Sequence, residues 1–79
     1  MLINETSKKT ELTKKAIEYY IEQGLISPSI LDNGYRDFSR DDVKKLEKIA
    51  VLRKLGISTD DIKIVLSDES KSALQTLVV

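Results

Sequence analysis

The 79-residue sequence contains no cysteine and no histidine. Disulfide bridges, structural zinc, most transition-metal sites and thiol or imidazole catalysis are therefore excluded from these residues. Net charge is also absent, because 13 Lys and Arg residues balance 13 Asp and Glu residues. A basic surface is the usual sign of a nucleic-acid-binding domain, so this balance argues against one until the charges are placed in a fold.

Long apolar runs are missing as well, and no basic region precedes an apolar stretch at the N-terminus. The sequence therefore predicts no membrane span and no signal peptide, and we expect a cytoplasmic protein. With 41% hydrophobic and 33% charged residues, the composition is that of a folded domain. The length allows one domain with a thin core.

Only one proline and three glycines interrupt the sequence, so their positions mark element boundaries. We expect a short helix over residues 3–10, followed by a tight turn. A second helix is expected to begin after a Thr13 cap and to end at Gly24. Helical spacing of apolar side chains predicts its buried face, which consists of Ala16, Ile17, Tyr20 and Ile21.

Asn33-Gly34, between two apolar segments, predicts a β-hairpin because both residues tolerate positive φ. We expect a small two-stranded wing there, with Pro28 at an edge where its missing N–H is not needed.

Two further helices are predicted by repeated capping signals, in which a serine precedes a carboxylate by three residues. Ser39 begins the first, and Gly56 is expected to close it in the left-handed conformation. Ser58 begins the second. The predicted buried residues are Val43, Leu46, Ile49, Ala50 and Leu55 in the first helix and Ile62, Val65 and Leu66 in the second.

The elements together predict a mainly α fold, a winged helix-turn-helix with about four helices and a small two-stranded wing, over residues 1–67. Residues 68–79 are expected to form a tail, in which Leu74, Leu77 and Val78 begin another apolar stripe. The acidic pairs at 41–42 and 60–61 could suggest a divalent cation, but helix capping explains them, so we predict no metal.

A catalytic function is not supported, because no glycine-rich nucleophile turn or phosphate-binding loop accompanies any serine. We predict no enzyme and no cofactor.

A helix, tight turn, helix and wing is an arrangement that places the second helix in the DNA major groove. Lys14 and Lys15 face outward near the start of that helix, where they suit phosphate or base-edge contacts. An ordinary solvated face is the alternative, but outward Tyr19 favours binding because an exposed aromatic hydroxyl suits a partner.

Arg36, beside Tyr35 after the wing turn, could clamp a phosphate or pair with Asp32 or Asp37. Two basic residues near the end of the third helix could reach the DNA backbone or neutralise the helix C-terminus. The candidate DNA-binding residues are Thr13, Lys14, Lys15, Glu18, Tyr19, Tyr20, Tyr35, Arg36, Arg53 and Lys54.

Residues 16–26, 33–39 and 52–58 contain a tyrosine pair before Gly-Leu-Ile, a Gly-Tyr-Arg wing and a Leu-Arg-Lys-Leu-Gly segment. In this order and spacing they resemble the DNA-binding domain of the MerR (mercury-resistance regulator) family, over residues 2 to 67. The resemblance implies a homodimer on pseudo-palindromic promoter DNA, which it distorts so that RNA polymerase can use it. It also implies that Lys14, Lys15 and Tyr19 lie on the recognition helix, Tyr20 is the second tyrosine of the pair, Arg36 meets phosphate, and Arg53 belongs to a second contact region.

Three positions depart from the family pattern. Glu11 stands where the family usually has Gly. Ile30 stands where the family has Arg or a similar base, so we expect the affinity for DNA to depend less steeply on salt than in a typical member. Glu18 replaces an Arg. Its carboxylate could accept from a cytosine amino group, or could pair with Lys14 or Lys15.

Family members continue into a long dimerisation helix, so residues 68–79 could hold its truncated beginning. We therefore expect sequence-specific binding of double-stranded promoter DNA by a homodimeric regulator associated with the nucleoid. A protein-interaction or DNA-architectural accessory module on the same fold is the alternative. Net neutrality then predicts that one domain binds weakly and that two copies are needed.

Overall fold

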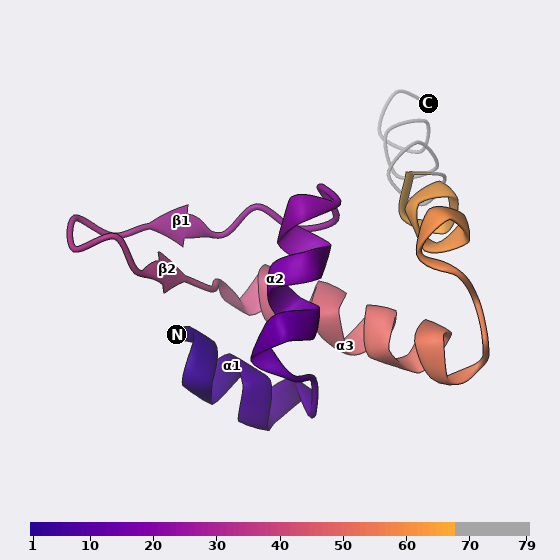
Figure 1. Cartoon of the computed structure of the whole chain (residues 1–79), viewed down its shortest axis with the longest axis horizontal. Helices are drawn as coiled ribbons and strands as arrows, with labels where there is room; N and C mark the ends of the chain where they lie inside the picture. Colours follow the sequence, from indigo (N-terminus) through magenta and orange to yellow (C-terminus); the bar gives the residue numbers. More distant parts are fainter. Residues whose placement is uncertain (68–79) are drawn as a thin grey trace, which may run out of the picture.

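The computed structural model describes residues 1–67. It contains α1 (Ile3–Thr10), α2 (Lys14–Glu22), the strands β1 (Ser29–Ile30) and β2 (Arg36–Asp37), and α3 (Arg40–Lys54) (Figure 1). A further helix begins at residue 59 and reaches residue 67, the last that is described. The expected mainly helical fold with a small wing is confirmed. The predicted tail at 68–79 lies outside the described residues.

The turn between α1 and α2 consists of three residues, as the sequence predicts. Glu11 ends α1 in the left-handed conformation, with φ of 61°. This conformation costs a residue with a Cβ about 1 kcal/mol or more. The hydroxyl of Ser7 donates to the carbonyl of Leu12 and ties the turn to α1.

The predicted ends of α2 are confirmed. The Thr13 side chain accepts a hydrogen bond from the backbone N–H of Ala16 at 3.1 Å, which satisfies one of the free donors of the first turn. At the other end Gly24 adopts a φ of 78°, a conformation that glycine reaches without steric cost.

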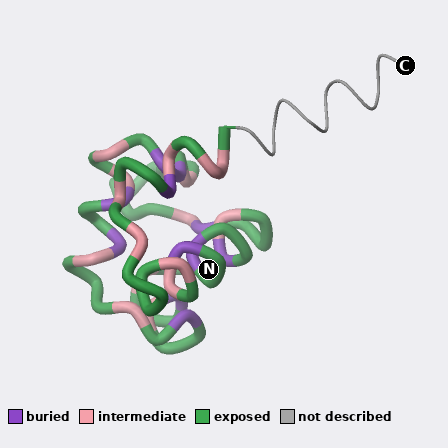
Figure 2. The backbone as a smooth tube through the Cα atoms, turned by 90° about the vertical axis from the view of Figure 1, so that its right-hand side faces the viewer, coloured by how far each residue is buried: buried purple, intermediate pink, exposed green. Residues whose placement is uncertain are grey.

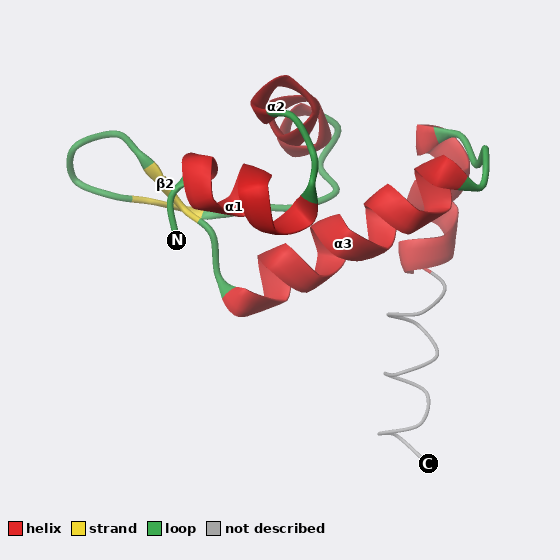
Figure 3. Ribbon diagram, turned by 90° about the horizontal axis from the view of Figure 1, so that it is seen from below, coloured by secondary structure: helices red, strands yellow, loops and turns green. Residues whose placement is uncertain are grey.

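The core lies where α1 packs against both α2 and α3 (Figure 3). Figure 2 shows the buried segments turned toward the middle of the described residues. Two threonines of α1 are buried among them, and their hydroxyls donate to carbonyls one turn earlier, at 2.9 Å for Thr6 and 2.7 Å for Thr10. The buried hydrophobic residues are Ile17, Tyr20, Leu25, Ile26, Phe38, Val43, Leu46, Ile49 and Ile62.

The predicted capping box at the start of α3 is confirmed in both directions. The Ser39 hydroxyl accepts from the N–H of Asp42 at 3.1 Å, and the Asp42 carboxylate accepts from the N–H of Ser39 at 2.9 Å. The next helix begins in a similar way, with the Ser58 hydroxyl accepting from the N–H of Asp61 at 3.2 Å. Between them Gly56 is left-handed, with φ of 84°.

Leu55 corrects the predicted buried face, because 71% of its surface is exposed. It follows Leu46 by nine residues, which is two and a half turns of an α-helix. The two side chains therefore point to opposite sides, and Leu55 also lies at the C-cap, where the backbone leaves the helix.

The wing is present but its turn differs from the expected Asn-Gly turn. Five residues, 31–35, connect strands in which Ile30 pairs with Arg36. Gly34 alone in this loop has positive φ, at 87°, whereas the Asn33 side chain accepts from the N–H of Tyr35 at 3.1 Å. The N–H of Gly34 donates to the carbonyl of Leu31 at 2.8 Å, so residues 31–34 form a four-residue turn that ends at the left-handed glycine.

Candidate nucleic-acid interface

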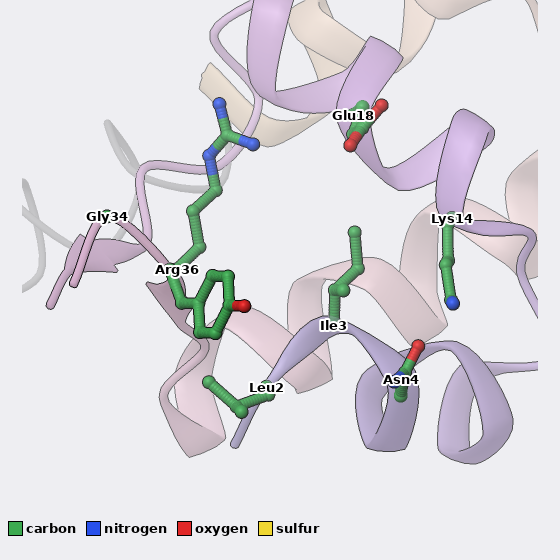
Figure 4. A pocket seen from close by; sticks show the side chains of 8 residues that line it. Leu2, Ile3, Asn4, Lys14, Glu18, Gly34 and Arg36 are labelled. Carbon is green, nitrogen blue, oxygen red and sulfur yellow. The ribbon is translucent and has the colours of Figure 1, made fainter.

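A groove of about 410 Å³ lies between the start of α1, the first half of α2 and the wing. Figure 4 shows Arg36 of the wing on one side of this groove and Lys14 and Glu18 of α2 on the other. The fold thus brings together predicted site residues from two segments of the sequence. The complete lining consists of Leu2, Ile3, Asn4, Lys14, Glu18, Gly34, Tyr35 and Arg36.

The charged groups of the groove are not neutralised by one another. Within residues 1–67 the single ion pair joins the amino group of Met1 to Asp37. The alternative in which Arg36 pairs with Asp37 or Asp32 is therefore not realised. An exposed guanidinium without an ion-pair partner keeps its donors available for an anion such as phosphate.

The outer face of α2 is as the sequence predicts. Lys14, Lys15, Glu18, Tyr19 and Glu22 are all exposed, and Tyr19 retains 44% of its surface. Thr13, at the cap, is exposed too, and its oxygen already accepts the Ala16 bond. This face presents two cations at the N-terminal end of the helix, where the backbone dipole also favours anions.

Tyr20 is the exception among the candidate residues. Only 6% of its surface is exposed and it belongs to the hydrophobic core. Its ring packs edge-on against that of Tyr19, with centroids 5.7 Å apart. The predicted place of Tyr20 in the buried face of α2 is therefore confirmed, whereas its expected contribution to the DNA interface stays a prediction.

Arg53 and Lys54 are exposed but do not line the groove. They lie at the end of α3 remote from the wing (Figure 1). The Arg53 guanidinium donates to the carbonyl of Ile57 at 3.0 Å. This bond satisfies a carbonyl just beyond the helix and favours the interpretation that Arg53 stabilises the helix C-terminus.

No sequence pattern predicts that Leu2, Ile3 and Asn4 contribute to the groove. Their position depends on a contact between distant segments, in which the N–H of Phe38 donates to the carbonyl of Met1 at 2.7 Å. This bond holds the start of α1 beside the base of the wing. No local pattern in residues 2–4 could reveal it.

Two other features are absent from the described part of the chain. No group of three or more acidic side chains there is arranged to hold a metal ion. No helix in residues 1–67 is both long and apolar enough to cross a membrane.

Comparison with known proteins identifies the relatives of this chain. Its residues 1–69 match the family described as MerR HTH family regulatory protein. It is 35% identical over 68 residues to the HTH-type transcriptional regulator CueR of Yersinia pestis, a match that covers 85% of this chain and 49% of CueR. The HTH-type transcriptional regulator HmrR of Rhizobium leguminosarum bv. viciae is 40% identical over 67 residues, or 85% of this chain and 52% of HmrR. The chain thus spans about half the length of these curated relatives.

A solved structure with the same fold is the crystal structure of HiNmlR, a MerR family regulator lacking the sensor domain, bound to promoter DNA. The two agree with a TM-score of 0.76 at 20% identity, over 99% of this chain and 64% of the other. This likeness concerns the fold, whereas the family match covers most of the sequence. The chain therefore belongs to the MerR family of helix-turn-helix regulatory proteins, which are transcription regulators and not enzymes.

Proposed function

We propose that this chain binds double-stranded promoter DNA sequence-specifically, as the DNA-binding domain of a MerR-type transcription regulator. The observation that carries the proposal is the groove in which Lys14 of α2 and Arg36 of the wing lie without ion-pair partners among residues 1–67. Two unneutralised cations on neighbouring elements suit two neighbouring phosphates of one duplex.

In this proposal α2 enters the major groove, which is about 12 Å wide and admits one helix. Its exposed face carries Lys14 and Lys15 toward phosphates or base edges, and Tyr19 beside them. Arg36 holds a flanking phosphate from the wing, so the duplex is contacted at two points that fix its orientation.

We further propose that the regulator acts as a homodimer. One chain presents one recognition helix and has a formal net charge of zero, so its attraction to DNA is weak. A second copy supplies a second helix for the other half-site of a pseudo-palindrome. The dimer acts in the cytoplasm on nucleoid DNA, and it influences RNA polymerase indirectly by distorting the promoter.

Titration of duplex DNA with the 79-residue chain at two salt concentrations tests DNA binding. Affinity is expected to fall steeply with salt. Arg36→Glu is expected to weaken binding to all sequences by about tenfold or more, because a charge-assisted phosphate bond is replaced by repulsion. Arg40→Glu is the matched control, since Arg40 is exposed and does not line the groove.

Equal effects of the two substitutions would contradict the role of the wing. Binding of wild type that does not depend on salt would favour a protein-interaction module instead. Molecular mass in solution, measured with and without DNA, tests the dimer, and we expect two chains on each bound duplex.

A further inference from the structure

Glu18 lies at the middle of α2, on its exposed face, and lines the groove together with Lys14 and Arg36. Any duplex that occupies this groove must approach the Glu18 carboxylate. Because DNA phosphates are negative, a carboxylate here opposes binding unless it meets a hydrogen-bond donor.

The carboxylate has no ion-pair partner in residues 1–67. Lys14 and Lys15 precede it by four and three residues, which are the spacings of neighbours on a helix surface. An acidic residue that follows its lysine by four positions forms the weaker of the two helical pair orientations. The Glu18 oxygens are therefore free to accept bonds from a ligand.

The major groove offers carboxylates two kinds of donor, the N4 amino group of cytosine and the N6 amino group of adenine. In adenine the N6 group lies beside the N7 acceptor, whose lone pair repels a carboxylate. Cytosine presents its amino group without a neighbouring acceptor on the same base. The guanine paired with it offers O6 and N7, which accept from a lysine.

We propose that Glu18 is a specificity-determining residue that accepts a hydrogen bond from cytosine N4, while Lys14 donates to a guanine of the same or the neighbouring base pair. This inference rests on the proposed DNA-binding function. Glu18 selects by exclusion: bases without an amino donor leave its carboxylate desolvated and unpaired, and those sequences are rejected.

Selection of bound sequences from randomised duplexes, with the 79-residue chain, tests the inference. Wild type is expected to enrich cytosine at one position of each half-site. Glu18→Ala is expected to lose that preference and to keep the preferences at other positions. A change from cytosine to thymine at this position should lower the affinity of wild type about tenfold and that of Glu18→Ala only slightly. Glu18→Gln moves the preference toward adenine, which an amide recognises through N6 and N7.

Glu22→Gln is the matched control, because Glu22 is exposed on the same helix, carries the same charge and does not line the groove. It is expected to retain the cytosine preference and to bind all duplexes more tightly, because it removes a negative charge without touching the groove.

If wild type binds DNA selectively and Glu18→Ala prefers the same bases, the specificity role of Glu18 is overturned, and the proposed DNA-binding function is not affected. If wild type instead enriches adenine and Glu18→Ala loses that preference, cytosine is not the base that Glu18 recognises. Wild type that enriches no sequence would instead contradict the proposed function itself.

Discussion

Lys63 donates a hydrogen bond from Nζ to Oε1 of Gln23 at 3.1 Å, across 40 residues of sequence. Gln23 is the C-cap of α2, so this contact joins α2 to the helix that begins at residue 59. The neighbouring Ile62 is fully buried in the core. The last described helix therefore supports the C-terminal end of α2, and it contributes to the orientation of the proposed DNA-binding face.

In this last helix, substitution of a buried isoleucine is expected to lower stability much more than substitution of an exposed one. Ile62→Ala should lower the free energy of unfolding by about 2 to 4 kcal/mol, because it leaves a cavity in a fully packed site. Ile64→Ala should change it by less than about 0.5 kcal/mol, since 58% of Ile64 is exposed. Urea denaturation followed by circular dichroism measures both. Similar losses for the two variants would mean that this helix does not dock through Ile62.

Glu11→Gly is expected to stabilise the protein. Glu11 has a φ of 61°, and glycine relieves the steric cost of that conformation, although it adds entropy to the unfolded chain. The net gain should be about 0.5 to 1 kcal/mol, seen as a higher urea midpoint with an unchanged slope. Lys8→Gly, at an exposed position inside α1, should instead cost about 1 kcal/mol. Destabilisation by both glycines would contradict the strain assigned to Glu11.

Thr13→Ala is expected to weaken the start of α2. The substitution removes the acceptor of the Ala16 N–H bond and should cost about 1 kcal/mol of stability. DNA affinity should fall with it, because Lys14 and Lys15 lie in the first turn that then frays. Thr13→Ser keeps a capping hydroxyl and should restore both properties. A serine variant as unstable as the alanine variant would show that the methyl group, not the cap, is what matters.

Arg53→Ala tests the two roles assigned to this arginine. The loss of the hydrogen bond to the Ile57 carbonyl should lower the free energy of unfolding by about 0.5 to 1 kcal/mol. Affinity for duplex DNA at a temperature where the variant is fully folded should change by less than about threefold. Lys54→Ala, at the adjacent exposed position, should leave stability nearly unchanged. A large loss of DNA affinity in Arg53→Ala without loss of stability would support the second contact region instead.

Local chemistry was sufficient to predict where the helices begin and end. Thr13, Ser39 and Ser58 accept the capping bonds that their side chains predict, and Gly24 and Gly56 are left-handed as expected. Each of these features depends on groups within a few residues of one another, and a sequence displays such groups directly.

Some side-chain positions are harder to predict from local pattern. The apolar stripe of α2 predicts that Tyr20 is buried, and the structure places it in the core. Leu55 is apolar but exposed, because helical periodicity turns it away from Leu46 and α3 ends before it. In the wing, Asn33 uses its side chain as a backbone acceptor and leaves positive φ to Gly34.

The sequence by itself determined the order of the elements, their caps and the outward cations of α2, because these follow from side-chain chemistry and helical periodicity. Only the tertiary structure decided which of these residues share a surface. The bond from Phe38 to Met1 holds the start of α1 beside the wing, and so Leu2, Lys14 and Arg36 line one groove. Such contacts join residues far apart in the chain, and their geometry is set by how the core packs.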